Sequence, residues 1–346
     1  MLLKRSILTQ QYTEVFTMKL DNKTRLALAI TVGFICTFIM IPVVLVLFDA
    51  PTTVDMTPLE SIELYANDEP KAHFYITVYR TETSEFQEIE FERYLIGVVA
   101  AEMPALFELD ALRAQAIAAR TYAMRILEHD DYISDTVMHQ VFLDDDQLRE
   151  RWGDAFEVHF GAIEEAVMST QGIILTYDGE LITPMFFAMS SGATENSEDV
   201  FPSARPYLRS VESTGYEDHA NFAVEEGFTI EDLRIAFGDD EITADNITIL
   251  EMSVGGNVDQ IQLGNEIFAG RDVREVLGLR SAAFSIETVE GGIIFTTYGN
   301  GHGVGMSQHG ANVMAQNGYN YMEILQHFYQ NVTLVEKDDF INNHGY

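Results

Sequence analysis

The sequence predicts a mixed α+β domain that follows an N-terminal membrane anchor. Helical and strand-like patterns are interspersed without the regular β-α-β order of a doubly wound sheet, which favours α+β over α/β. Hydrophobic residues make up 47% of the chain, enough for a packed core. Residues 26–48 form one uncharged apolar stretch that is long enough to cross a bilayer as a helix.

Residues 26–48 are interpreted as an uncleaved signal that remains as a single transmembrane helix. The stretch is longer than the apolar core of a cleavable signal peptide, and no clear cleavage site follows it. Basic residues precede it and acidic residues follow it, so residues 1–25 should lie in the cytoplasm and the rest outside. We expect a linker at 49–70, a folded domain with a groove at 71–336, and a tail at 337–346.

The charge of the chain excludes several classes of partner. The formal net charge is −35, and the first 25 residues are basic on balance, so the exterior part is more acidic still. Such a surface repels nucleic acid and anionic lipid. It suits a saline or alkaline exterior or a basic protein partner. Cys36 is the only cysteine and lies in the apolar stretch, so the exterior domain has neither a disulfide nor a cysteine-based zinc site.

The elements of the domain follow from periodicity and from helix-stop residues. Pro104 cannot continue a helix, so the helix before it should end at about Glu102. Asp178-Gly179 between two apolar runs predicts a hairpin. The predicted helices lie at 94–102, 109–127, 144–153, 161–170 and 228–237, with two more after residue 311. The predicted strands lie at 73–81, 172–177, 181–189 and 293–299, with others mixed into 247–284.

Glu102 is the candidate proton donor. It ends an apolar helix, beside apolar residues such as Val99 and Met103, and the negative end of the helix dipole faces it. Both features disfavour the ionised carboxyl and should raise its pKa, as a general acid near neutral pH requires. The alternative is a solvated residue, or an ion-pair partner for Arg113 or Arg120.

The second candidate region is the glycine-rich loop GNGHGVGMSQHGA at 299–311. Its glycines would let a sugar or peptide approach the backbone beside His302, Ser307 and Gln308. The alternative is that this segment is only a tight structural turn. The segment lacks the pattern of a phosphate-binding loop, and GMSQHG misses the G-x-S-x-G spacing of a serine hydrolase by one residue. No histidine pair has zinc-ligand spacing, since His302 and His309 are seven apart.

Four segments in one order resemble the stage II sporulation protein D family. They are YLIGVVAAEMP…ALRAQAIAARTYA, TPMFFAMSSGATENSEDVF, DVREVLGLRSAAFSI and GHGVGMSQHGA…MAQNGYNYMEIL. The resemblance covers about residues 71–336. It implies a lytic transglycosylase, anchored in the mother-cell membrane facing the forespore. Such an enzyme cleaves peptidoglycan between N-acetylmuramic acid and N-acetylglucosamine during engulfment, leaves 1,6-anhydro ends, and prefers strands without stem peptides.

The resemblance also implies the site and its partners. It places the catalytic glutamate at Glu102 and the substrate-binding positions at Arg120, Ser190, Ser191, Thr194, His302, Gly303, Ser307 and Gln308. No cofactor is implied. Some relatives bind zinc near residues 135–141, where this chain keeps only His139, so no metal is expected. The implied partners are peptidoglycan glycan strands, a cell-wall amidase and a membrane protein of an engulfment complex.

A single carboxyl is enough for this reaction, although ordinary glycosidases need two. Glu102 would first protonate the leaving oxygen and then take the proton of the muramoyl C6 hydroxyl as that oxygen closes on C1. Ser191, His302 and Gln308 would hold the sugar, and Arg120 would orient Glu102 or the substrate. Two other functions stay open: a non-catalytic glycan-binding activator of an amidase, and a serine hydrolase that uses Ser307.

Overall fold

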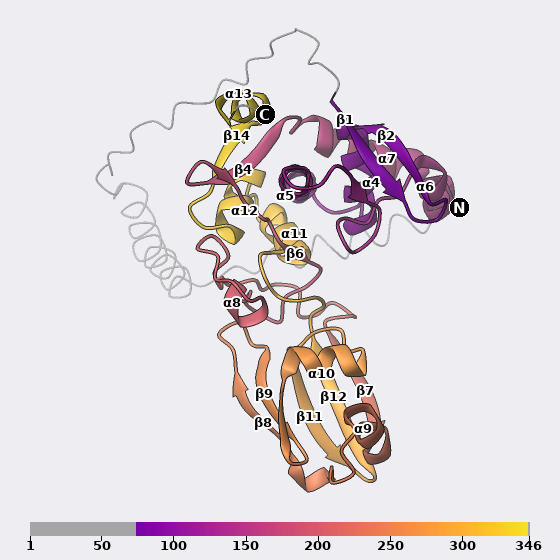
Figure 1. Cartoon of the computed structure of the whole chain (residues 1–346), viewed down its shortest axis with the longest axis vertical. Helices are drawn as coiled ribbons and strands as arrows, with labels where there is room; N and C mark the ends of the chain where they lie inside the picture. Colours follow the sequence, from indigo (N-terminus) through magenta and orange to yellow (C-terminus); the bar gives the residue numbers. More distant parts are fainter. Residues whose placement is uncertain (1–73, 345–346) are drawn as a thin grey trace, which may run out of the picture. The chain divides into compact units, whose positions relative to one another are not determined.

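The fold is α+β, as the sequence predicts. A computed structural model describes residues 74–344, which belong to one compact unit that begins at Lys71 (Figure 1). It contains several small sheets with helices packed against them. The expected anchor at 26–48 and linker at 49–70 lie outside the described residues. Within residues 74–344, no helix is both long enough and apolar enough to cross a membrane.

The first sheet leads directly into the helix that carries Glu102. β1 (Tyr75–Arg80) pairs antiparallel with β2 (Glu85–Glu90) and parallel with the short β3 (Ile133–Ser134). α4 (Phe91–Glu102) begins where the Glu90 carboxylate accepts the Arg93 N–H at 2.7 Å. The helix ends at Glu102, as predicted, because Met103 is already extended before Pro104.

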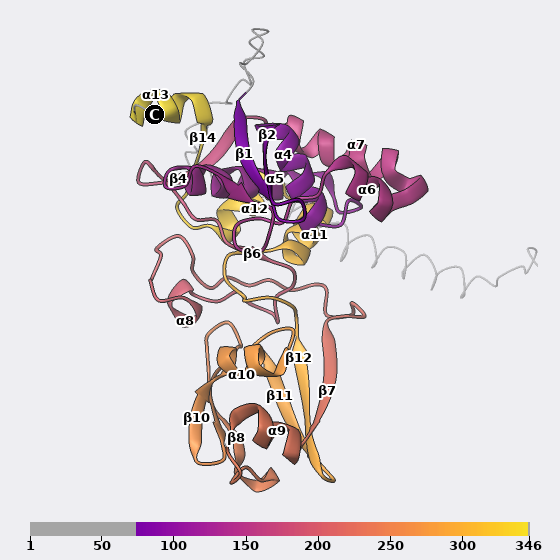
Figure 2. The same cartoon turned by 45° about the vertical axis from the view of Figure 1, so that its right-hand side comes forward.

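α5 (Leu109–Leu127) is the central helix of this part of the domain, and it is buried along most of its length. One side packs with α4 and α7 (Phe156–Met168), and the other with α11 (Gln308–Gln316) and α12 (Tyr321–Phe328) (Figures 1 and 2). Alanines face both sides and let the neighbouring helices approach closely. The buried alanines of α5 are Ala111, Ala114, Ala116, Ala118, Ala119 and Ala123.

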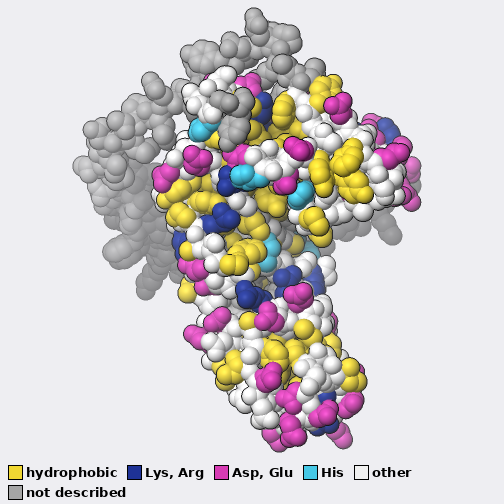
Figure 3. Space-filling view, in the orientation of Figure 1, with side chains coloured by type: hydrophobic (Ala, Val, Ile, Leu, Met, Phe, Trp, Pro, Cys, Tyr) yellow, Lys and Arg dark blue, Asp and Glu magenta, His cyan; other side chains and the backbone are white. Residues whose placement is uncertain are grey.

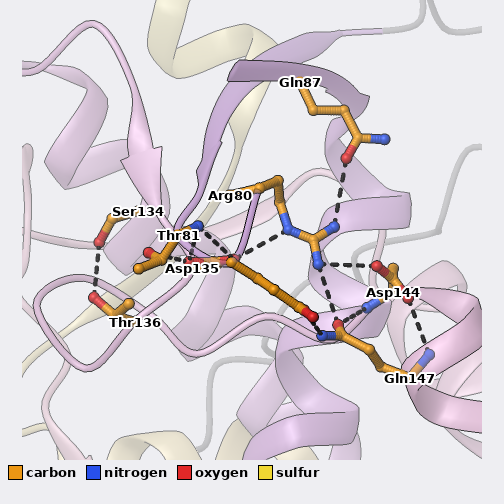
Figure 4. Close-up of polar contacts among 9 residues, drawn as sticks. Arg80, Thr81, Gln87, Ser134, Asp135, Thr136, Asp144 and Gln147 are labelled. Atoms are coloured by element: carbon orange, nitrogen blue, oxygen red, sulfur yellow. Dashed lines mark hydrogen bonds and ion pairs between the residues drawn. The ribbon is translucent and has the colours of Figure 1, made fainter. Parts of the chain in front are cut away.

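A polar network behind α4 is centred on Arg80 (Figure 4). The Arg80 guanidinium donates to Asp135 at 3.0 Å, to Asp144 at 2.9 Å and to Gln147 at 3.1 Å. Asp144 and Gln147 also form the capping box of α6 (Asp145–Trp152), so the Asp144 carboxylate caps this helix. Burial raises the pKa of Asp135 and Asp144, but hydrogen bonds outweigh it and hold both below the usual range. Thr81 donates to Asp135, the Gln147 N–H donates to Asp144, and Arg80 adds hydrogen bonds and its charge to both. The network thereby ties β1 to the loop that packs on α4.

The predicted hairpin is correct at its turn but wrong in its second strand. β4 (Ile173–Tyr177) pairs with β5, which ends after only two residues (Glu180–Leu181), and with β14 (Thr333–Glu336). The rest of the apolar run forms β6 (Phe186–Phe187), which pairs parallel with β13 (Met306–Ser307). Pro184 has no N–H to continue a ladder. The pairing of β6 with β13 brings the polar loop after β6 next to the glycine-rich loop.

Residues 223–298 hold two three-stranded antiparallel sheets, in the orders β11-β12-β7 and β10-β9-β8. The predicted helix at 228–237 starts later, as α9 (Ile230–Phe237), because Thr229 caps it with Asp232 and the preceding residues form β7 (Ala223–Thr229). The remaining elements are β8 (Ile247–Met252), β9 (Val258–Leu263), β10 (Glu266–Ala269), α10 (Gly270–Leu277), β11 (Phe284–Val289) and β12 (Gly292–Tyr298).

The C-terminal residues belong to the folded unit. The two helices expected after the glycine-rich loop are α11 and α12. Residues 337–346, expected as a tail, include the helix α13 (Lys337–His344). Its Phe340 is 4% exposed and packs in the same core cluster as α4.

Candidate active site

Glu102 lies at the C-terminal end of α4 as a partly buried side chain. Burial raises the pKa of its carboxyl, while a hydrogen bond from Gln308 acts in the opposite direction. The pKa rise expected from the sequence is confirmed, with burial as its main cause. Arg151 donates to the carbonyl oxygens of Ala100 and Ala101 at 3.2 and 3.4 Å, which places a cation at the negative end of this helix.

Gln308 connects the glycine-rich loop to Glu102. It is the first residue of α11 and is 4% exposed, so its amide donates to Glu102 from a fixed position. The hydroxyl of Ser307 accepts the Gly310 N–H at 3.1 Å and caps the helix. The structure therefore brings two predicted site residues, Glu102 and Gln308, into contact.

Aromatic rings surround the same end of α11. The His309 ring lies 5.1 Å from that of Phe107, in the loop after Glu102, and 4.8 Å from that of His219. Burial and the nearby His219 lower the pKa of His309 to about 4, so the ring is neutral at physiological pH. Sequence spacing gave no signal for this group, because its members come from three separate segments.

Arg120 does not contact substrate in this arrangement. Its side chain is fully buried, with a salt bridge to Glu92 at 2.6 Å and hydrogen bonds to the carbonyl oxygens of Val167 and Ile173, both at 3.1 Å. A side chain without exposed surface cannot reach a bound sugar. The expected role in orienting Glu102 or the substrate is therefore not retained, and Arg120 instead joins α4, α5 and α7 in the core.

The serine-rich loop uses most of its hydroxyl groups to hold its own shape. Ser190 donates to the Ala193 carbonyl at 2.7 Å, and Thr194 donates to the Arg209 carbonyl at 3.4 Å and accepts the Val211 N–H at 2.9 Å. Both side chains are buried. Ser191 is more open and donates to the Gly255 carbonyl at 3.3 Å. Of the three predicted hydroxyls, Ser191 is thus the best placed to meet a ligand.

His302 and Gly303 pack against this loop. Nδ1 of His302 accepts the Val304 N–H at 3.1 Å, and burial together with nearby Arg274 lowers the pKa of the ring to about 4. Gly303 has φ of +87° and its carbonyl accepts the Glu195 N–H at 2.7 Å. A Cβ at Gly303 would lie 2.9 Å from Cγ of Glu195, so glycine is required for both reasons.

Comparisons with known proteins show which family the chain belongs to. Residues 79–177 match the stage II sporulation protein family. Stage II sporulation protein D of Bacillus amyloliquefaciens is 38% identical over 278 residues, which cover 78% of this chain and 81% of that protein. The chain belongs to the stage II sporulation protein D family. The Bacillus subtilis (strain 168) protein of the same name is 39% identical over 280 residues, with the same coverage of 78% and 81%.

A further relative has a different name. The amidase enhancer of Bacillus subtilis (strain 168) is 25% identical over 295 residues, which cover 69% of this chain and 40% of that protein. This chain is thus similar in sequence to a protein that is named as an enhancer of an amidase.

The geometry also bears on the serine hydrolase and metal alternatives. Ser307 has no exposed surface, and its hydroxyl lies near Tyr216, at 3.5 Å, rather than near a histidine ring nitrogen. This is not the arrangement of an activated nucleophile. Nδ1 of His139 accepts the Ser134 N–H at 3.0 Å. Among residues 74–344, no group of three or more His, Cys, Asp or Glu is arranged to hold a metal ion.

Glu195 is the residue that the sequence analysis missed. It lies in the polar loop after β6, is 1% exposed, and has a pKa that burial raises against hydrogen bonds from Ser253 and Asn257. The only sequence signal was an acidic residue inside the segment SSGATEN. Nothing local distinguishes it from a solvated loop residue, because the groups that bury it come from residues 253–258 and 302–303.

Proposed function

We propose that the chain is a lytic transglycosylase that cleaves the glycan of peptidoglycan, with Glu102 as its single acid and base. The observation that carries this proposal is the carboxyl of Glu102, whose pKa burial raises and which Gln308 holds from the glycine-rich loop. Membership of the sporulation family supplies the biological setting. A carboxyl that keeps its proton to higher pH than usual suits protonation of a glycosidic oxygen.

The reaction needs no second carboxyl and no water. The Glu102 proton passes to the oxygen that links N-acetylmuramic acid to N-acetylglucosamine, and the bond from that oxygen to C1 breaks. The C6 hydroxyl oxygen of the muramoyl residue then closes on C1 while ionised Glu102 takes its proton. The product carries a 1,6-anhydro end, and Glu102 regains its proton. Gln308 would steady the carboxylate between the two steps.

The test compares Glu102→Gln with the parent chain on peptidoglycan glycan from which stem peptides have been removed. We expect the parent to release fragments with 1,6-anhydro ends, identified by mass spectrometry, and the variant to release essentially none. Glu108→Gln, an exposed position in the next segment, is the matched control and should cleave like the parent. Fragments with hydrated reducing ends, or full cleavage by Glu102→Gln, would refute the proposal.

A second function is supported by the amidase enhancer relationship. In that case the chain would bind glycan and activate a cell-wall amidase without cleaving the glycan itself. Amidase turnover on intact peptidoglycan would then rise equally with the parent chain and with Glu102→Gln. If Glu102→Gln no longer activated the amidase, the activation would depend on glycan cleavage by this chain, and the non-catalytic role would be excluded.

The cellular setting belongs to the same proposal. The apolar stretch at 26–48 would anchor the chain in the mother-cell membrane, with the described domain facing the forespore. There it would work with a cell-wall amidase and a membrane protein during engulfment.

A further inference from the structure

β2 lies at the edge of the first sheet, and one side of its backbone has no strand beside it among residues 74–344. The Phe91 N–H donates to the Phe74 carbonyl at 2.8 Å, so these two residues form a hydrogen-bonded pair next to the β1–β2 ladder. Such pairs alternate along antiparallel strands, so residues 85, 87 and 89 bond β1. The N–H and carbonyl groups of Phe86 and Glu88 therefore point away from β1 and form a free edge.

The direction of the Tyr79 carbonyl agrees with this alternation. Tyr79 lies opposite Phe86 in the ladder, but its carbonyl accepts the Asp135 N–H at 3.2 Å, on the side of β1 that faces β3. It is therefore not bonded to Phe86. Unpaired backbone groups on an edge strand are a template to which another strand can add.

Exposed aromatic rings lie on one face of the sheet beside this free edge. The Phe86 ring lies 5.1 Å from the Tyr79 ring and 5.1 Å from the Tyr132 ring. Phe86 is 62% exposed and Tyr132 is 40% exposed, whereas Ile76 and Val78, on the opposite face of β1, are buried in the core. The three contacting rings thus form an apolar patch on the surface.

A cavity of about 340 Å³ lies on the other face of β2. Its walls include Gln87 and Ile89 of β2, Arg93 of α4, and residues of the segment 142–148 that leads into α6. Because side chains alternate along a strand, Gln87 and Ile89 point to the face opposite Phe86. A strand added to the free edge would therefore place its side chains alternately over the three rings and over the cavity.

Unpaired negative charge surrounds the free edge. The cavity is lined by three successive aspartates, at 144–146, and by two arginines. Each arginine is already paired with one of these aspartates, whereas Asp146 forms no salt bridge within residues 74–344. Three exposed acidic residues of the β1–β2 hairpin also lack a salt bridge there, namely Glu82, Glu85 and Glu88. Figure 3 shows hydrophobic side chains bordered by Asp and Glu in the part that holds β1, β2 and α6.

We propose that the free edge of β2 binds an extended segment of another protein in which apolar and basic side chains alternate. The segment would add as a strand beside Phe86 and Glu88. Its apolar side chains would lie on the three rings, and its basic side chains would point toward the aspartates at 144–146. Main-chain hydrogen bonds would supply affinity, and the two faces would select the alternating pattern.

Charge argues against other occupants of this edge. A second copy of the chain would set Glu85, Glu88 and Glu90 against the same acidic row, and like charges on neighbouring strands repel. Residues 49–70 of this chain carry six acidic and no basic residues, so they are repelled as well. The same holds for anionic lipid and nucleic acid. A basic segment is the partner that matches the charge.

The test measures binding of short peptides with blocked ends to the purified full chain by calorimetry. One peptide alternates valine and lysine, a second has the same residues with all valines before all lysines, and a third alternates valine and glutamate. We expect the first to bind at least about tenfold more tightly than the others, because only it can meet both faces of the added strand. Its affinity should fall as the salt concentration rises.

The decisive variant is Glu88→Pro. It removes the N–H that an added strand would use but no hydrogen bond to β1, so the sheet should persist, as circular dichroism can check. We expect it to lose at least about tenfold in affinity for the alternating valine-lysine peptide. Glu88→Ala is the matched control, because it removes the same charge and keeps the N–H, and it should retain most of the affinity.

Two further variants keep the proposal testable if Glu88→Pro fails to fold. Phe86→Ala weakens the apolar face and Asp146→Asn the charged face, and each should lower affinity for the valine-lysine peptide. Full affinity in both, equal affinity of Glu88→Pro and Glu88→Ala, or equal binding of the three peptides would overturn the inference. Dimerisation that Glu88→Pro abolishes would also overturn it, because a second copy would then occupy the edge.

The inference does not rest on the proposed function. β1, β2 and α6 hold none of the candidate site residues, so peptide binding at this edge can be present or absent whatever the outcome of the cleavage test with Glu102→Gln.

Discussion

The side chain of Gln308, the first residue of α11, hydrogen-bonds the carboxyl of Glu102, the last residue of α4. Two segments far apart in the sequence thus meet at one partly buried acid. Burial favours the protonated form of Glu102 and raises its pKa, and the hydrogen bond from Gln308 favours the ionised form and offsets part of that rise. The first two predictions follow from this balance.

Gln308→Met should move the pH profile of glycan cleavage. The variant removes the donor that lowers the pKa of Glu102, so the carboxyl should keep its proton to higher pH. Because the acid form starts the proposed reaction, the alkaline limb of kcat/KM should shift upward in pH. Gln316→Met, exposed at the end of the same helix, should leave the profile in place. A downward shift would mean that Gln308 does not stabilise the carboxylate.

Glu102→Gln should stabilise the fold at neutral pH. The unfolded chain ionises Glu102 near pH 4.5, whereas the raised pKa keeps the folded chain protonated to higher pH. Stability is therefore lost as pH rises from about 4.5 through the folded pKa, and glutamine escapes that loss. Thermal unfolding should show a higher Tm for the variant at pH 7 and no difference at pH 4. A lower Tm at pH 7 would contradict the burial argument.

Arg120→Met should destabilise the domain by about 3–5 kcal/mol, because it leaves the buried carboxylate of Glu92 without its partner. Glu92→Leu alone should have a similar cost, and the double variant should lose less than the sum of the two. Urea unfolding of the four proteins measures this coupling. If Arg120→Met unfolds like the parent but loses glycan binding, Arg120 contacts substrate after all.

Gly97→Ala should weaken the packing behind α4. A Cβ at this position would lie 2.4 Å from the Leu143 carbonyl oxygen and from the Phe142 ring. We therefore expect the free energy of unfolding to fall by about 1–3 kcal/mol. Gly161→Ala is the matched control in α7. A Cβ there meets open space, so this change should raise the free energy of unfolding by about 0.5–1 kcal/mol. Urea unfolding distinguishes the two, and equal effects would show that the loop on α4 is not tightly packed.

The residues around Glu102 show which structural features a local sequence pattern can predict. Pro104 ends α4 at the predicted residue, because the restriction that proline places on its neighbour is local. The apolar run after Asp178-Gly179 was less informative. Its apolar pattern indicated a strand, but such a pattern does not specify which strand it pairs with. In the structure β6 pairs with β13 instead of β4.

Sequence alone predicted the family, the α+β class, the end of α4 at Glu102 and the raised pKa of that carboxyl, because short-range periodicity, proline and ordered motifs carry that information. Tertiary structure decided which side chains meet. In the folded chain, Arg120 forms a salt bridge with Glu92, Gln308 hydrogen-bonds Glu102, and Glu195 is buried where Ser253 and Asn257 donate to it. Ion pairing and burial depend on distances through space between segments, and a one-dimensional pattern does not contain those distances.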